Sequence, residues 1–419
     1  MKLLIENFYN IKHAELDFKK FNILIGPQAA GKSLIAKVLY FMEDRILHYS
    51  AHELADPDIE TKEFNKDSLK LFYSIFEKKS LDINFKLTIS NNINRTWEFT
   101  YTGFNPNDLK DITLSETQEN PSISSAVKTV VQHALENNID FAKSMGKKFN
   151  SEIDKDAFLS KVYNYIVSGL PPEADTRRIF IPASRSLVNT ISDNSFWMTE
   201  NNVDFLLNKF GQIYSRQIKK DTEDAPIECY QLSSIIKGNI ERSNNEYFIN
   251  ENGRTVALSN ASSGQQAATP ILIGLNRVQN KDIFHAFIEE PEAHIFPEAQ
   301  YLLTRYISEI HNHAETKITL TTHSPYILTA VNTLIYAGTV GKQSEAKAAK
   351  VKEIIPEDQW LNSEDVAAYM VEADGAVRSI MDEETGLIEA DSIDDVSDVI
   401  GAEFNKLLDI EFDEEGHDE

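Results

Sequence analysis

The sequence lacks several features that define membrane and secreted proteins. It holds a single cysteine, Cys229, in 419 residues, which excludes an internal disulfide and a cysteine-based zinc site. No run of about 18 apolar residues is present, so we expect no membrane span. Residues 1–8 lack the apolar core and small-residue cleavage site of a secretory signal. These absences predict a cytoplasmic protein without membrane contact.

Positive charge is also scarce, with 41 Lys and Arg against 66 Asp and Glu and a net charge of −25. Residues 382–419 alone carry sixteen carboxylates and one basic side chain, Lys406. This acidic end keeps the protein soluble, or it offers a surface to a basic protein partner. An acidic chain repels the nucleic-acid backbone unless a basic patch overcomes the repulsion. The candidates are Arg216 with Lys219 and Lys220, and Lys147 with Lys148. Nucleic-acid binding is compatible with the sequence but not required.

The clearest motif is a phosphate-binding loop (P-loop) of the pattern G-x-x-x-x-G-K-[ST]. It follows the apolar run 21–25 and precedes apolar residues at helical spacing, from Leu34 to Met42, so a strand–loop–helix unit is predicted. We expect Lys32 to reach the outer phosphates of ATP and Ser33 to bind Mg²⁺. The eight ATP-binding candidates are Gly26, Pro27, Gln28, Ala29, Ala30, Gly31, Lys32 and Ser33.

Two carboxylates follow a second apolar strand at 283–288. The C-terminal end of a buried strand is where α/β folds place ligands. Phosphoryl transfer needs one carboxylate near the metal ion and one group that orients the attacking water. We assign Glu289 to the metal ion and Glu290 to the water. A strand that runs into a solvated acidic loop would look the same, and the P-loop upstream argues against that reading.

Two further segments are ambiguous in isolation. A Ser-Ser-Gly turn, with Ser262, Ser263, Gly264 and Gln265, opens an apolar helix at 267–275 and could bind an anion. An ordinary capped helix start has the same sequence. His323 ends a strand at 317–322, where it could contact a γ-phosphate or could be a plain loop residue. Along the chain the order is P-loop, Ser-Ser-Gly turn, carboxylate-ended strand and His-ended strand.

That order, with the opening segments 3–5, 8–12 and 21–27, resembles the heads of ABC-type ATPases, and within them the SMC/RecF/RecN and OLD-type ATPases. The segments 287–297 and 321–325 look most like the OLD-type branch. The resemblance implies ATP hydrolysis by a homodimer or an assembly of dimers, with Glu290 and His323 as catalytic residues. It also implies that Ser262–Gln265 complete the partner's site. No heptad pattern lasts four repeats, so no coiled-coil arm is expected.

The expected fold is α/β: an ABC-ATPase-like head with a mixed sheet around the P-loop and an antiparallel lobe, a helical insertion and a small acidic C-terminal region. We divide the chain into 1–103 (head, N-terminal part), 104–250 (mostly helical insertion with a core strand near 177–185), 251–345 (head, C-terminal part) and 346–419 (acidic accessory region). Hairpins are expected at 81–101, 247–258 and 369–381, and an amphipathic helix at about 392–408.

The pattern departs from the family at several points. Gln28, Ala29 and Ala30 replace a run that commonly contains glycine, and Glu289 replaces an Asp. Arg185 lies near the expected Q-loop, the segment that follows the strand at 177–185. About 95 residues follow Ser324, which is too few for the nuclease domain of OLD proteins.

The chain therefore resembles the ATPase subunits of bacterial two-gene phage-defence systems, in which a separate effector protein supplies the output. A RecF-like ATPase of DNA repair or chromosome maintenance that binds DNA directly is the alternative. A nucleotide-gated scaffold with almost no turnover is a third.

Overall fold

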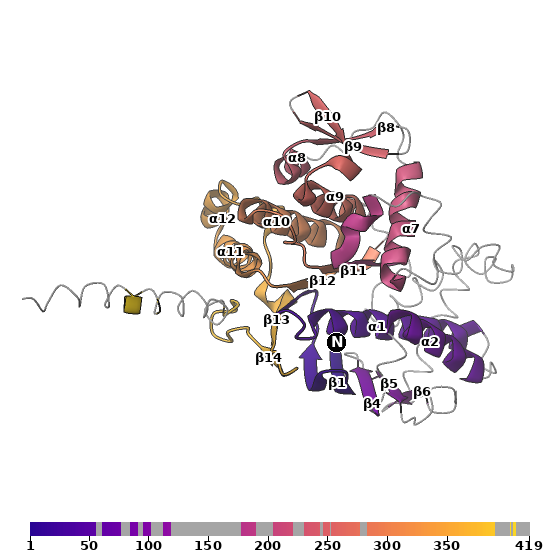
Figure 1. Ribbon diagram of the computed structural model, residues 1–419. Coiled ribbons are helices and arrows are strands. Elements are labelled where there is room, and N and C mark those ends of the chain that lie inside the picture. Colours follow the sequence, from indigo (N-terminus) through magenta and orange to yellow (C-terminus); the bar gives the residue numbers. More distant parts are fainter. Residues whose placement is uncertain are drawn as a thin grey trace, which may run out of the picture.

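The computed structural model describes residues 1–55, 61–76, 84–90, 95–101, 112–118, 177–189, 204–220, 230–243, 246–251, 253–276, 283–389, 403 and 405–407. In these residues the chain forms a six-stranded core sheet, a five-stranded antiparallel sheet and a three-stranded antiparallel sheet. The first two lie on opposite sides of helix α1 (Lys32–Ala55) (Figure 1). The predicted α/β class, with a P-loop core and an antiparallel lobe, is confirmed.

The core sheet has the strand order β14 (Val377–Ser379), β13 (Val366–Val371), β3 (Phe21–Ile25), β12 (Lys317–Thr322), β11 (Ile283–Glu289), β7 (Arg177–Ile181). Its neighbouring strands are parallel except β13 and β14. β3 lies between β12 and β13 and is buried along its whole length. Burial on both faces explains why its sequence is an unbroken apolar run rather than an alternation.

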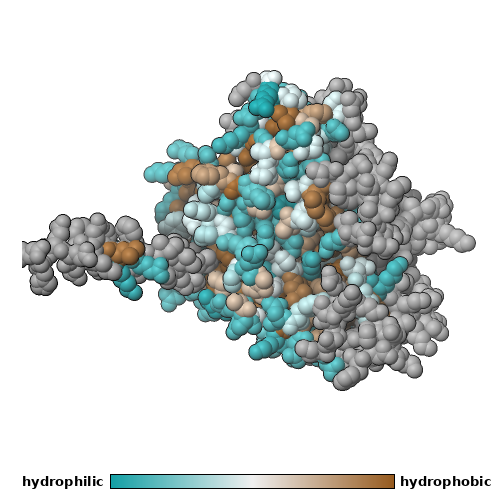
Figure 2. Space-filling view, viewed as in Figure 1, coloured by the Kyte–Doolittle hydropathy of each residue, from teal (hydrophilic) through white to brown (hydrophobic). Residues whose placement is uncertain are grey.

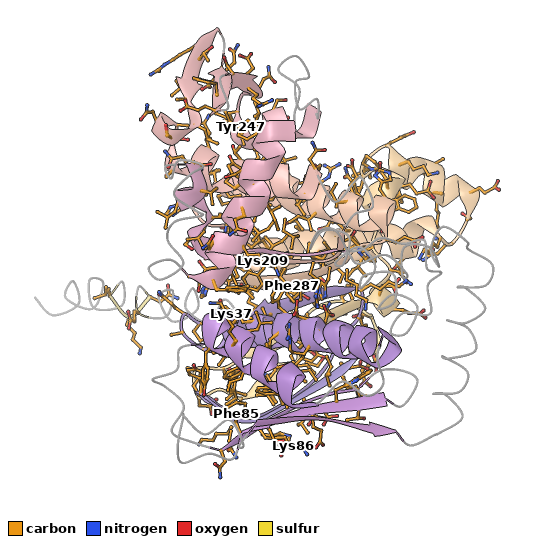
Figure 3. The ribbon with its side chains drawn as sticks, turned by 90° about the vertical axis from the view of Figure 1, so that its right-hand side faces the viewer. Lys37, Phe85, Lys86, Lys209, Tyr247 and Phe287 are labelled. Carbon is orange, nitrogen blue, oxygen red and sulfur yellow. The ribbon has the colours of Figure 1, made fainter. Side chains whose placement is uncertain are left out.

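Helix α1 fills the space between the core sheet and the five-stranded sheet. The latter has the order β2 (Ile11–Asp17), β1 (Lys2–Phe8), β4 (Phe85–Ser90), β5 (Arg95–Tyr101), β6 (Ile112–Gln118). Residues 35–45 of α1 are buried except Lys37, because the helix has a sheet on each side and needs no polar face. Below it, the rings of Phe85 and Phe99 stack on Phe72 of α2 (Thr61–Ile75). Figure 3 shows Phe85 in this lower layer and Phe287 close to α1.

The other face of the core sheet is covered by helices, and the small third sheet lies beyond α8 and α9 (Figure 1). These elements are α7 (Phe205–Lys220), α8 (Tyr230–Ile236), β8 (Asn239–Ser243), β9 (Glu246–Glu251), β10 (Arg254–Ala257), α9 (Ser263–Asn276), α10 (Pro297–Ala314), α11 (Pro325–Gly341) and α12 (Glu345–Lys352). Side chains of β3 alternate between two cores, with Leu24 in the α1 core and Ile23 and Ile25 in the other. On the face shown in Figure 2, apolar residues form small patches between hydrophilic ones. Among the described helices, none is long and apolar enough to cross a membrane.

The three predicted hairpins are present as antiparallel pairs: β4 with β5, β9 with β10, and β13 with β14. The predicted turn residues 91, 92 and 252 lie outside the described residues. So do residues 119–176 of the expected helical insertion, which include both lysines at 147 and 148, as well as Cys229 and most of residues 390–419. Arg216, Lys219 and Lys220 lie in the last turns of α7.

Three expectations differ from the structure. Residues 239–243 form β8 rather than helix, since a strand in which only Ile240 is buried carries little apolar signal. The strand expected to reach Arg185 ends at Ile181, and a 3₁₀ helix, η4 (Ala183–Asn189), follows. The hairpin assigned to the accessory region 346–419 is part of the core sheet, where β13 pairs with β3. Pairing with a strand some 345 residues earlier cannot be inferred from local patterns.

A buried polar chain joins α1 to two core strands below the P-loop. Glu43 and His285 are 0% and 1% exposed. His285 Nδ1 lies 3.0 Å from Glu43 Oε2, and its Nε2 lies 2.8 Å from Thr319 Oγ1. The neutral imidazole satisfies this geometry: Nδ1–H donates to the carboxylate, and the Thr319 hydroxyl donates to Nε2. Burial lowers the pKa of His285, although Glu43 opposes the shift. The neutral form is therefore favoured in the folded state.

We predict that the free energy of unfolding falls as the pH drops below about 6.5, the usual pKa of histidine in an unfolded chain. Because the folded pKa of His285 is lowered, the unfolded state binds the proton first, so the stabilisation is complete above that pH and is lost toward the folded pKa. Denaturant titrations between pH 8 and pH 5 measure the slope of the free energy of unfolding against pH. His285→Asn keeps an N–H donor near Glu43 and cannot be protonated, so its slope should be shallower. Equal slopes in both proteins would contradict the assignment.

Candidate functional site

The P-loop connects β3 to α1 and is held from two sides. Gly26 and Gly31 have φ angles of +150° and +115°, a region that glycine adopts readily. A Cβ at Gly26 would lie 2.0 Å from the carbonyl oxygen of Val371 in β13. On the other side, Asn10 Nδ2 donates to the carbonyl of Ala30 at 2.7 Å. The loop is therefore fixed by the turn between β1 and β2 and by a strand near the other end of the chain.

Lys32 is the first residue of α1 and is 4% exposed. Its Nζ donates to the carbonyl oxygens of Gly26 at 2.9 Å and Pro27 at 2.6 Å, and it lies 3.3 Å from His323 Nδ1. Burial lowers the pKa of Lys32, whereas nearby carboxylates, Glu290 first, oppose the shift. The ammonium group is thus held at the loop, where the sequence predicted the outer phosphates.

His323 follows the last residue of β12 and contacts both halves of the site. Its Nε2 lies 3.1 Å from Glu290 Oε1, and its Nδ1 lies 3.0 Å from the carbonyl oxygen of Gly26. Nδ1 either donates to Gly26 or accepts from Lys32, since one nitrogen cannot do both. The position of the imidazole proton therefore decides which P-loop group His323 binds. Residues that lie about 290 positions apart in the sequence meet here.

The two assigned carboxylates leave β11 in different directions. Glu289 is 6% exposed, and its Oε2 accepts from the backbone N–H of Ala183 at 3.1 Å. The Oε1 atom of Glu289 is buried and has no hydrogen-bond partner among the described residues. Glu290 is about a third exposed and has a φ of +43°. A non-glycine residue in this region is strained, and such strain is concentrated at functional sites.

The donor set fits Mg²⁺. The unpartnered buried oxygen of Glu289 needs a cation or a donor. Ser33 supplies a hydroxyl in the first turn of α1. Carboxylate and hydroxyl oxygens are the hard ligands that Mg²⁺ prefers, usually together with water and substrate phosphates.

Two residues of the site had no assigned role in the sequence analysis. Glu292 Oε1 accepts from the Thr322 hydroxyl at 2.8 Å and from the backbone N–H of His323 at 2.6 Å, so it fixes the end of β12. Its proximity in sequence to Glu289 and Glu290 was the available signal. The second is Arg185, expected near the Q-loop, which lies in η4, is fully buried and donates to the carbonyl oxygens of both assigned glutamates.

The Ser-Ser-Gly segment lies elsewhere and has the geometry of a helix start. Ser262 and Gln265 form a capping box, in which Gln265 Oε1 accepts from the backbone N–H of Ser262 at 3.1 Å. Gly264 packs closely, because an added Cβ would lie 2.8 Å from the carbonyl oxygen of His294. Ser262 and Ser263 are exposed. Among the described residues, no hydrogen bond or ion pair joins this segment to the P-loop.

A P-loop at the end of a central parallel strand, faced by a histidine and a glutamate from neighbouring strands, defines a P-loop nucleotide-binding protein of the ATPase class. The model of the AAA ATPase domain family matches residues 1–328. The chain belongs to this family, and its function is that of an ATP-binding ATPase domain.

Three solved structures are similar to the chain at low identity. An SMC head bound to the C-winged helix domain of ScpA is 12% identical, with a TM-score of 0.40, and the match covers 78% of this chain and 90% of that one. The SMC head domain from Thermotoga maritima is 12% identical, with a TM-score of 0.35 and the same coverage. An Smc head with an extended coiled coil, bound to the C-terminal domain of ScpA derived from Pyrococcus furiosus, is 11% identical, with a TM-score of 0.37. That match covers 95% of this chain and 98% of the other. No curated protein matches the chain.

Two substitutions in the P-loop should differ strongly in their effects on stability. Gly26→Ala would force β13 away from the loop, and we expect a loss of several kcal/mol, about the cost of severe overpacking together with backbone strain. Ala29 has a φ of +62°, so Ala29→Gly should relieve roughly 1 kcal/mol of left-handed strain, against which the added freedom of the unfolded chain acts. Thermal unfolding of both variants measures this. An equal loss in both would contradict the backbone geometry described for the loop.

Proposed function

We propose that this protein hydrolyses ATP at sites shared between two chains. Hydrolysis is inferred from one observation. Lys32 Nζ lies 3.3 Å from His323 Nδ1, and His323 Nε2 lies 3.1 Å from Glu290 Oε1, so the three side chains meet beside the P-loop. A phosphate-binding cation, an imidazole and a carboxylate are thereby placed around one position. Phosphoryl transfer uses a cation that binds the phosphates and a group that orients the attacking water, and these contacts support such a site.

Each residue has a role that follows from its contacts. Lys32 exchanges its carbonyl partners, Gly26 and Pro27, for the outer phosphates of ATP and neutralises their charge. Glu290, partly exposed and hydrogen-bonded to His323, orients the attacking water. His323 faces the γ-phosphate from the end of β12, where Glu292 holds its backbone. Ser33 and Glu289 would hold Mg²⁺, which supplies charge neutralisation at the phosphates when bound.

The position of the Ser262–Gln265 segment supports a shared site. The start of helix α9 is a positive dipole end, which suits a phosphate. Ser262 and Ser263 are exposed and are not bonded to the P-loop of their own chain in the described residues. A second copy of the chain can therefore present this segment to the nucleotide, so that two chains form two composite sites. A homodimer, or an assembly of such dimers, follows from this arrangement.

A separate effector protein, and a role in defence against phages, extend the proposal. They rest on the resemblance of segments 287–297 and 321–325 to OLD-type ATPases. The net charge of −25 favours a basic protein partner over a nucleic-acid backbone. Identification of the protein that co-purifies with this chain tests the effector, and a gel shift with duplex DNA tests the RecF-like alternative.

Substitution of each carboxylate tests the assigned chemistry. Glu290→Gln keeps the shape of the side chain but cannot polarise water, so ATP should remain bound while hydrolysis falls by roughly 10²- to 10⁴-fold. Glu289→Gln should instead raise the Mg²⁺ concentration needed for half-maximal activity. Calorimetry and steady-state phosphate release measure both. Normal hydrolysis by Glu290→Gln would assign the water-orienting role to another residue.

Mixing two inactive variants tests whether the sites are shared. Ser263→Asp places a carboxylate where the partner's phosphate should lie, while its position at an exposed helix start spares the fold. It is preferable to Gly264→Asp, because Gly264 packs against His294. Combined with Lys32→Ala, a mixed dimer has one site with both changes and one with neither.

Random pairing makes half of the dimers mixed, so the mixture should regain up to roughly a quarter of wild-type activity if the two sites act independently. Each variant alone serves as the baseline. Mixed dimers that form but show no recovery would argue against sites shared in this way.

A further inference from the structure

Two backbone carbonyls in the first half of helix α9 accept hydrogen bonds from side chains outside the helix. Pro270 lies inside the helix. It has no N–H, so the carbonyl of Gln266, four residues earlier, loses its usual donor within the helix. Asn189 Nδ2 donates to this carbonyl at 2.8 Å, and Arg185 Nε donates to the carbonyl of Ala267, also at 2.8 Å. Both donors come from η4, so this short segment is bonded to the first turns of α9.

The same segment is bonded to the carboxylate end of β11. Arg185 Nη1 donates to the carbonyl of Glu289 at 2.8 Å, and its Nη2 donates to the carbonyl of Glu290 at 2.9 Å. The backbone N–H of Ala183 donates to the Glu289 carboxylate at 3.1 Å. Arg185 is 0% exposed. Burial lowers its pKa to about 10, against the opposing charges of Glu292, Glu290 and Glu289, so the guanidinium stays charged at neutral pH.

These bonds constrain α9 and the end of β11 to move together. A buried guanidinium that lost one carbonyl would leave an unpaired charged donor away from water, which costs more than an exposed hydrogen bond. The planar group also fixes the directions of its donors. A shift of α9 should therefore move the backbone of Glu289 and Glu290 as well, because the hydrogen bonds of Arg185 join the two segments.

We propose that η4, through Arg185 and Asn189, couples the position of helix α9 to the alignment of Glu289 and Glu290. The inference rests on the proposed function. In a shared site, α9 contacts the nucleotide of the partner, whereas Glu290 acts on the nucleotide of its own chain. Closure of the dimer on one nucleotide then adjusts the catalytic carboxylates of the other site. Arg185 and Asn189 are positioning residues, since neither belongs to the P-loop or to the assigned catalytic set.

Two substitutions and a matched control test the coupling in the full-length chain. Arg185→Lys keeps the charge but loses the planar group whose fixed donors reach four carbonyl oxygens. Asn189→Ala removes the bond to α9, together with the hydrogen bond that Asn189 Oδ1 accepts from the Tyr214 hydroxyl. The control, Arg178→Lys, also changes a largely buried arginine of the same region, one that pairs with Asp44 at 2.8 Å near the start of β7. Steady-state ATPase assays give kcat and KM, calorimetry with Mg-ATP gives affinity, and circular dichroism reports the fold.

We expect Arg185→Lys to lower kcat by roughly tenfold to a hundredfold, as for small misplacements of catalytic groups, with KM and ATP affinity within about threefold of wild type. Asn189→Ala should lower kcat less, and the double variant should be no slower than Arg185→Lys alone, because both act in one connection. The control should retain wild-type kcat per folded molecule.

Several results would overturn the inference. Folded Asn189→Ala with wild-type kcat would do so even if Arg185→Lys failed to fold. Multiplying effects in the double variant, or an equal loss of kcat in Arg178→Lys, would do the same. Wild-type protein that does not hydrolyse ATP would overturn the proposed function and this inference together, whereas active wild-type protein with unaffected variants would overturn the inference alone.

Discussion

The register of the parallel strands β3, β12 and β11 determines where the P-loop, His323 and the two assigned glutamates lie. Ile25 pairs with Thr322, and Glu289 pairs with Thr321, so the strands end at one edge of the sheet. Gly26, His323 and Glu290 are each the next residue after these ends. A shift of one residue in either pairing would turn a side chain to the opposite face. The backbone hydrogen bonds of three buried strands thus set the geometry of the site before any side chain contributes.

Helix α1 is held at its start and near its middle by buried polar contacts. At its start, Lys32 bonds the P-loop carbonyls and meets His323. Three turns later, Glu43 meets His285 on the neighbouring strand β11. Both sets of contacts would be weak in water, but burial makes the loss of either partner costly. The helix is thereby fixed in rotation and along its axis between the two sheets, which apolar packing alone specifies less well.

The sequence predicted the local parts of this arrangement well. The P-loop, the carboxylate-ended strand β11 and the hairpins depend on short patterns, and the structure contains them. Residues that act through backbone contacts were harder to assign. Glu292 binds a backbone N–H, Arg185 binds four carbonyls, and Ala29 adopts a left-handed conformation, and none of these features can be inferred from residue spacing. The position of β13 beside β3 depends on pairing across most of the chain, so its short apolar run gave no information about its neighbour.

The contact between Gly26 and Val371 has a consequence for biosynthesis. The P-loop is made within the first tenth of the chain, whereas β13, which covers that side of β3, is made near its end. At roughly 5 to 20 residues per second, a ribosome needs about 20 to 70 seconds to add the residues between them. Throughout that time β3 has an uncovered edge, which is a site for wrong pairing. Nascent chains of this protein therefore contain the P-loop well before the strand that packs against it. A chain that terminates before β13 has the P-loop without that contact.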